Sequence, residues 1–193
     1  MQNKRSPRKL KVSSALTVLT IGYEGVSLAE FIATLKAAGV QLLLDIRELP
    51  ISRRKGFSKS ALSAALTDAG IEYSHERALG SPREIRYRLR EDGDLARFFS
   101  DFREYLHTQR PLLDTLARTI TGAVALLCYE RNHAECHRSI VADALARRVQ
   151  STARHLTVPH PDGDQQKSHT ARPHPRQSLP ATGCALASGR RLD

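Results

Sequence analysis

The chain has 193 residues, of which 40 % are hydrophobic, so it can form one domain with its own core but not two of ordinary size. No apolar run approaches the roughly 20 residues that a membrane-spanning helix needs, and the basic N-terminal segment lacks the apolar stretch of a secretory signal, so we expect a cytoplasmic protein without a membrane partner. The net charge of +10 favours contact with polyanions, although an arginine-rich composition is also a coding bias of GC-rich genomes.

The two ends of the chain differ in composition from its middle. Residues 1–14 form a basic arm, and residues 160–193 are rich in Pro, His, Ser, Gly and Arg without an apolar period. Neither segment can bury enough apolar surface to offset the entropy of ordering it, so we expect both to be disordered. The pattern between them predicts a single α/β domain over residues 15–159.

The first half of this domain is predicted to contain three strands separated by two helices. The β-branched run over residues 15–21 predicts a buried strand, and Ser27 begins a helix with a capping box. The leucine-rich run over residues 41–47 predicts the second strand. A helix over residues 58–68 then leads to a short third strand over residues 71–75.

The second half begins with an arginine-rich insert. The elements predicted from there on are the insert at 79–90, helices at 94–107 and 111–119, a strand at 122–128, a helix at 135–149 and an edge strand at 156–158. Because strands alternate with helices, the predicted fold is α/β, a single domain of Rossmann-like three-layer architecture. We expect a mostly parallel sheet of four to five strands with helices on both faces.

Polar side chains end each of the four main predicted strands. They are Tyr23 and Glu24 after the first strand, Asp45 and Arg47 on the second, Tyr73 and His75 on the third, and Cys128 and Glu130 at and after the fourth. Ligands of open parallel sheets bind beyond the carboxyl ends of the strands, so these side chains predict one polar site at that edge. A buried Asp45 needs a partner, Arg47 or Arg138, and a structural pair explains it about as well as a catalytic one.

The segment after the fourth strand carries the densest group of reactive residues. Cys136, His137 and Arg138 stand together where the last long helix begins. A helix N-terminus binds anions and lowers the pKa of a nearby thiol, so we expect Cys136 to be more reactive than Cys128. The candidate catalytic residues are Asp45, Cys128, Glu130, Cys136 and His137. The candidate substrate-binding residues are Tyr23, Glu24, Arg47, Tyr73, His75 and Arg138.

Known motifs for metals and phosphates are not matched. Seven residues separate Cys128 from Cys136, whereas structural zinc sites pair cysteines at shorter spacings, so we assign no metal ligand. Zinc held by Cys128, His133, Cys136 and His137, a reversible Cys128–Cys136 disulfide and an activated thiol stay open as alternatives. The turn at residues 22–25 lacks both the dinucleotide fingerprint and the P-loop lysine. The sequence identifies no cofactor.

The arginine-rich insert presents several basic side chains on one helical face. Arg83, Arg86 and Arg90 share that face, with Arg97 further along and Tyr87 beside them. This pattern is typical of a solvated helix face, and it also fits a surface that follows the phosphates of a nucleic acid.

Four motifs together resemble a known family. They are TIGYEG at 20–25, LLLDIRELPISRRKGF at 42–57, GIEYSHERALG at 70–80 and LLCYERNHAECHR at 126–138. In this order they are similar to the uncharacterised bacterial and archaeal family catalogued as domain of unknown function 488, over residues 16–148. The resemblance implies a compact α/β domain but no activity. The positions it implies for the family pattern are Gly22, Tyr23, Asp45, Arg47, Pro50, Tyr73, Leu79, Gly80, Cys128, Glu130, Cys136, His137 and Arg138.

Three functions are compatible with these residues. The first is an enzyme acting on a phosphate-bearing substrate, a nucleotide or nucleic acid, with Arg47, Arg138 and the last helix N-terminus holding the anion. The second is a non-catalytic nucleic-acid-binding or regulatory module, which the net charge favours. The third is a thiol redox sensor, which the cysteine pair favours.

Overall fold

The computed structural model describes residues 16–159. The predicted basic arm and the predicted tail lie outside these residues, as does Cys184. Within the described residues, no helix has both the length and the apolar character to cross a membrane.

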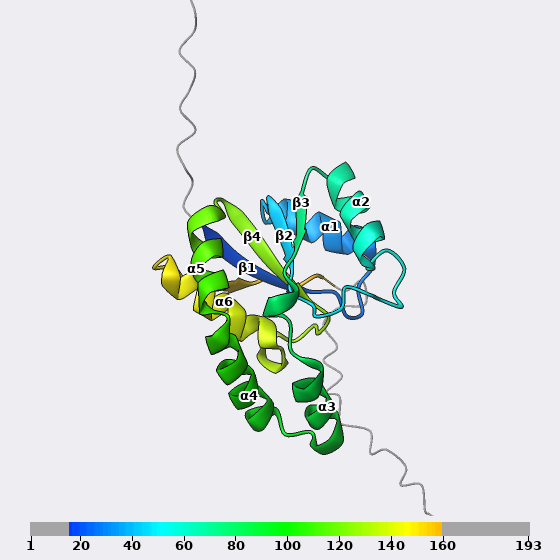
Figure 1. Cartoon of the computed structure of the whole chain (residues 1–193). Coiled ribbons are helices and arrows are strands. Elements are labelled where there is room, and N and C mark those ends of the chain that lie inside the picture. The colour runs from blue at the N-terminus through cyan, green and yellow to red at the C-terminus, as the bar shows by residue number, and fades with distance from the viewer. Residues whose placement is uncertain (1–15, 160–193) are drawn as a thin grey trace, which may run out of the picture. The chain divides into compact units, whose positions relative to one another are not determined.

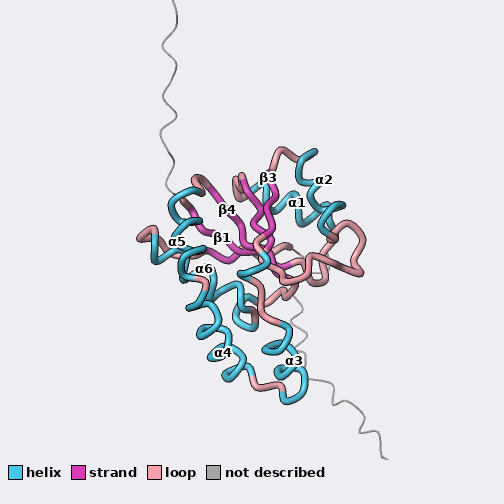
Figure 2. Tube along the Cα trace, viewed as in Figure 1, coloured by secondary structure: helices cyan, strands magenta, loops and turns pink. Residues whose placement is uncertain are grey.

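A five-stranded parallel sheet forms the middle layer of the fold (Figures 1 and 2). Its strands are β1 (Thr17–Gly22), β2 (Leu42–Asp45), β3 (Glu72–His75), β4 (Ala123–Cys128) and β5 (Arg154–His155). Their order across the sheet is β3-β2-β4-β1-β5, and every pair is parallel. The residues of β4 are almost all buried, as expected for a central strand covered on both faces.

Helices cover both faces of this sheet, which confirms the predicted three-layer α/β architecture (Figure 1). On one face lie α1 (Leu28–Ala37) and α2 (Lys59–Asp68), and on the other lie α4 (Leu95–Thr108), α5 (Arg110–Thr119) and α6 (His137–Arg148). The arginine-rich insert forms α3 (Arg83–Asp92), which packs beside α4 and has no buried residue. Two short 3₁₀ turns, η1 (Arg77–Leu79) and η2 (His133–Glu135), precede α3 and α6.

Each face of the sheet has its own hydrophobic cluster. Phe31 and Leu35 of α1 pack with the side chains that β1 and β2 direct to the same face. On the other face, Phe102 and Leu106 of α4 pack against α5 and α6. The helical spacing of five α4 side chains predicts that they belong to the core: Leu95, Phe98, Phe99, Phe102 and Leu106. The structure confirms this for Phe98, Phe102 and Leu106, whereas Leu95 is exposed.

The edge strand lies two residues earlier than its apolar pattern indicates. Arg154 and His155 pair with Leu19 and Thr20 of β1. The predicted edge residue Leu156 still donates its backbone N–H to the Thr20 carbonyl at 2.8 Å. Arg154 and His155 can form this strand although they are polar, because an edge strand needs to bury only part of its surface.

Candidate metal centre at the carboxyl ends of the strands

Four side chains with metal-binding atoms converge at the end of β4. Cys128 is the last residue of β4, Glu130 lies in the following loop, and Cys136 and His137 begin α6. One ligand atom from each lies within 4.8 Å of the others. The Sγ atoms of Cys128 and Cys136 lie 2.9 and 3.0 Å from Glu130 Oε2, and 3.7 and 3.9 Å from His137 Nδ1. We call this group the four-residue cluster.

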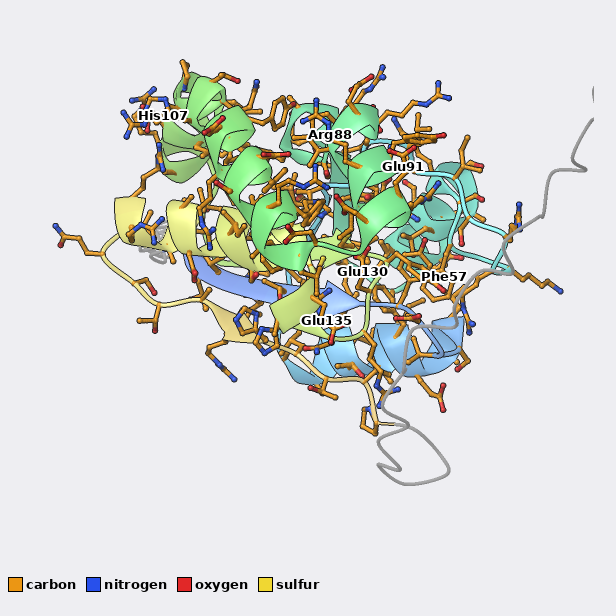
Figure 3. The ribbon with its side chains drawn as sticks, turned by 90° about the horizontal axis from the view of Figure 1, so that it is seen from below. Phe57, Arg88, Glu91, His107, Glu130 and Glu135 are labelled. Atoms are coloured by element: carbon orange, nitrogen blue, oxygen red, sulfur yellow. The ribbon has the colours of Figure 1, made fainter. Side chains whose placement is uncertain are left out.

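Three members of the four-residue cluster are buried. Cys128, Cys136 and His137 are at most 6 % exposed, whereas Glu130 is partly exposed. Figure 3 shows Glu130 beside the strand ends and the short turn that carries Glu135. The ligand atoms are therefore withdrawn from water except on the side of Glu130.

Burial decides the protonation of the two thiols. It raises the pKa of Cys128 and raises that of Cys136 further, although Cys136 also accepts the Arg138 backbone N–H at the start of α6. The expectation that the helix N-terminus lowers the pKa of Cys136 is therefore wrong, because loss of hydration outweighs the helix field. Both cysteines are thiols that donate to Glu130.

Glu130 and His137 present their lone pairs to these thiols. Although burial opposes its ionisation, the hydrogen bonds from Cys128 and Cys136 lower the pKa of Glu130 below its usual value. The His137 Nε2 atom lies 3.5 Å from the Ile46 carbonyl oxygen, a contact that favours the proton on Nε2 and leaves Nδ1 facing the sulfurs. The ring also packs edge-on against Phe102, which fixes its plane.

The loop that carries Glu130 is held from two sides. The Arg138 side chain is 1 % exposed, and its guanidinium donates to the backbone carbonyls of Glu130 and Arg131. On the other side the loop packs on the backbone of β1, where a Cβ added to Gly22 would lie 1.9 Å from the Glu130 carbonyl oxygen. Glu24 also accepts the Arg131 backbone N–H at 3.1 Å. Arg138, Gly22 and Glu24 thus position the loop.

A second polar group lies at the end of β2 and is a saturated ion pair. Asp45 is fully buried, and its Oδ1 accepts from the backbone N–H and Nε of Arg47. Its Oδ2 accepts from Arg47 at 2.5 Å and from the Tyr73 hydroxyl at 2.8 Å. Four donors occupy the four acceptor positions of a carboxylate, so Asp45 has no lone pair left for a substrate proton.

The polar side chains around the Asp45–Arg47 pair also form hydrogen bonds within the protein. The Nη1 atom of Arg47 donates to the Tyr23 hydroxyl and the Phe57 carbonyl, each at 2.9 Å. Burial works against the charge of Arg47, but the hydrogen bonds and charge of Asp45 outweigh it and raise its pKa. Burial and the bond to Asp45 likewise raise the pKa of Tyr73. His75 lies with its Nε2 2.8 Å from the Arg47 carbonyl oxygen.

The predicted polar edge therefore consists of two neighbouring groups. The four-residue cluster lies at the end of β4, and the Asp45–Arg47 pair lies at the end of β2; Ile46, between the two members of the pair, contacts His137. The two candidate anion-binding residues, Arg47 and Arg138, direct their guanidinium groups to protein acceptors. The sequence places three of the four residues, Cys128, Cys136 and His137, among possible zinc ligands, but not Glu130. The fourth residue that the spacing suggests, His133, stacks on His155 instead, because η2 turns the chain before it enters α6.

The donor atoms of the four-residue cluster suit a borderline-soft ion. Two sulfurs, one imidazole nitrogen and one carboxylate oxygen are the ligand types that zinc takes in proteins. Magnesium and calcium prefer oxygen ligands alone, so this set excludes them as natural occupants.

Comparison with known proteins identifies a family. A family model described as Domain of unknown function DUF488 matches residues 27–145. The matched segment runs from the N-cap of α1 into α6, so it contains all four residues of the cluster. No curated protein and no solved structure matches the chain significantly.

Proposed function

The chain belongs to the family described as Domain of unknown function DUF488, and we propose that its function depends on a zinc ion bound by Cys128, Glu130, Cys136 and His137. The observation that carries the proposal is the convergence of their four ligand atoms within 4.8 Å. Around a tetrahedral zinc, sulfur and nitrogen ligands lie about 3.6 Å apart. The two sulfur–nitrogen distances of 3.7 and 3.9 Å are close to this separation.

The Glu130 carboxylate lies closer to the two sulfurs than it would around a bound zinc ion. The protonated state of the thiols explains this difference. The thiols of Cys128 and Cys136 donate to Glu130 at 2.9 and 3.0 Å, which are hydrogen-bond distances. Zinc replaces these two protons when it binds, because the thiolate is the metal ligand. The hydrogen bonds would then give way to metal–ligand bonds at the same place.

The exposure pattern favours a catalytic role for this ion over a purely structural one. Two cysteines and one histidine form a ligand set that catalytic zinc sites use, with the fourth position open to substrate or water. Here the three corresponding side chains are buried, and Glu130 is the partly exposed ligand. We infer that a substrate would enter beside Glu130. A phosphate-bearing substrate, expected from the basic composition, would present an oxygen ligand that displaces the Glu130 carboxylate from the ion.

Zinc titration of the metal-free chain tests the proposal. We expect one zinc ion per chain under reducing conditions, and cobalt should give absorption bands that report thiolate ligation. The Cys136→Ser variant should bind zinc at least about 100-fold more weakly, since loss of a ligand costs more than loss of a supporting residue. The matched control is Cys184→Ser, which changes the cysteine outside the described residues and should leave affinity unaltered. Equal affinity in all three proteins would contradict the proposal.

A thiol redox sensor is the second candidate, favoured because both sulfurs contact the same oxygen of Glu130. In such a sensor, hydrogen peroxide would oxidise both thiols to one disulfide and be reduced to water. The same titration separates the two candidates. A chain that binds no zinc but forms a Cys128–Cys136 disulfide with peroxide, seen by mass spectrometry, would support the sensor and exclude the zinc site.

The raised thiol pKa values predict a steep pH dependence of zinc affinity. Burial raises the pKa of Cys128 and Cys136, so both are protonated at neutral pH and both protons must leave. The apparent affinity should therefore rise at least about 100-fold per pH unit between about pH 6 and pH 8. The rise should be steeper where His137 is still protonated, since burial lowers its pKa but the contacts with Cys136 and Glu130 raise it overall. Calorimetry in buffers of different ionisation enthalpy measures the released protons. Affinity independent of pH would mean that the thiols are not the ligands.

A further inference from the structure

A basic hollow lies on the helical face opposite α1 and α2. Residues of α4, α5 and α6 surround a hollow of about 440 Å³. Its basic rim consists of Arg103, Arg110, Arg147 and Arg148, and its apolar floor includes Leu106 and Leu113. We call this feature the basic groove. Figure 3 shows His107, another of its lining residues, well away from Glu130, so the groove is separate from the four-residue cluster.

Three of the four rim arginines have no acidic partner. Arg148 donates to Asp114 at 2.6 Å, and its charge is thereby compensated. Arg103, Arg110 and Arg147 are exposed and form no ion pair within residues 16–159. Asp143 is the single carboxylate among the lining residues. The rim therefore carries an excess of positive charge around a concave surface.

Unlike three of the rim arginines, several arginines of α3 and of the start of α4 form ion pairs. Arg86 pairs with Glu48, Arg88 with Asp101, and Arg97 with Asp92. These pairs compensate much of the basic face that the sequence pattern indicates on the insert. Within residues 16–159, Arg83 and Arg90 of α3 are exposed and form no ion pair, but the three uncompensated arginines around the basic groove share one hollow.

We propose that the basic groove binds the phosphodiester backbone of a nucleic acid. Guanidinium groups match phosphate oxygens in geometry and charge, and the three uncompensated ones come from three different helices around one hollow. The lining contains no Phe, Tyr or Trp on which bases could stack, so binding is through the backbone and independent of sequence. The net charge of +10 attracts such polyanions from a distance.

The test compares two triple variants of the full chain. Arg103→Gln, Arg110→Gln and Arg147→Gln together should weaken binding of a labelled mixed-sequence DNA duplex at least about 100-fold at low salt. The slope of log affinity against log salt should fall by about 0.9 for each arginine removed. The matched control removes the same charge from exposed arginines elsewhere, as Arg53→Gln, Arg83→Gln and Arg90→Gln, and should retain most of the affinity.

A variant that keeps the positive charge controls for misfolding of the glutamine variant. Replacing the same three rim arginines with lysine should keep the salt slope of the unmodified chain. Three outcomes would overturn the proposal. One is the absence of DNA binding at low salt, and another is an equal loss in the groove and control variants. The third is binding of poly-glutamate through the same arginines as tightly as DNA, which would indicate an acidic protein partner.

Discussion

Gly22→Ala should weaken zinc binding by about 10- to 100-fold, although Gly22 is not a ligand. A Cβ at this position would lie 1.9 Å from the Glu130 carbonyl oxygen and 2.8 Å from its carbonyl carbon. Both atoms belong to the backbone, so the clash cannot be relieved by turning a side chain. The loop must move away from β1 and take Glu130 with it, while Cys128 stays paired with residue 22 in the sheet. Competition with a chromogenic chelator measures the change in affinity.

Gly25→Ala is the matched control for this substitution. Gly25 lies in the same turn with a φ of +77°, and an added Cβ would meet nothing within 4 Å. Alanine there costs about 1–2 kcal/mol of stability through its left-handed backbone but does not touch the Glu130 loop. We expect zinc affinity close to that of the unmodified chain. If Gly22→Ala bound zinc as tightly as Gly25→Ala, Glu130 could not be a ligand held in place by β1.

Asp45→Ala should lower the free energy of unfolding by about 3–5 kcal/mol, the largest stability effect that we expect from a single substitution. The change leaves the guanidinium of Arg47, only 6 % exposed, without its carboxylate partner. It also removes the acceptor of the Tyr73 hydroxyl. A charge buried to this extent loses most of its hydration, so leaving it unpaired is costly. Urea unfolding in the presence of a chelator measures the effect without a contribution from zinc.

Two further variants distinguish the effect of the unpaired Arg47 charge from other effects of Asp45→Ala. Asp114→Ala breaks a half-exposed pair with Arg148 and should cost less than about 1 kcal/mol. The double variant Asp45→Leu and Arg47→Met removes both buried charges and should be more stable than Asp45→Ala alone. A double variant that is less stable than Asp45→Ala would show that the hydrogen bonds of Arg47 to Tyr23 and Phe57, rather than its unpaired charge, dominate.

The sheet could be predicted from sequence because its strands are strongly patterned. The run that forms β4 is short and apolar without interruption, which is typical of a strand buried on both faces. The strand ends then followed from topology, since parallel strands place their carboxyl ends at one edge. This reasoning correctly located Asp45, Cys128 and Glu130 at that edge. It placed the edge strand two residues too late, because Arg154 and His155 have no apolar pattern.

The hydrogen-bond partners of each polar side chain could not be predicted from the sequence. They depend on the orientation and burial of the side chain, which residue spacing does not specify. Arg138 follows His137 in the chain, yet its guanidinium binds two loop carbonyls while the imidazole faces two sulfurs. The thiol of Cys136 shows the same limit. Its position at a helix N-terminus predicts a lowered pKa, whereas its burial, which is visible only in three dimensions, reverses the direction.

The position of β4 in the sheet has a consequence for synthesis on the ribosome. β4 is the fourth strand to be made, yet it lies between β1 and β2, which do not pair with each other. Until residue 128 has left the exit tunnel, β1 therefore has no neighbour, and β2 can pair only with β3. The nascent chain thus carries unpaired, apolar strand edges for most of its translation, a state prone to association with other chains. Chaperones that shield such edges should matter more for this chain than for one whose strands pair in the order of synthesis.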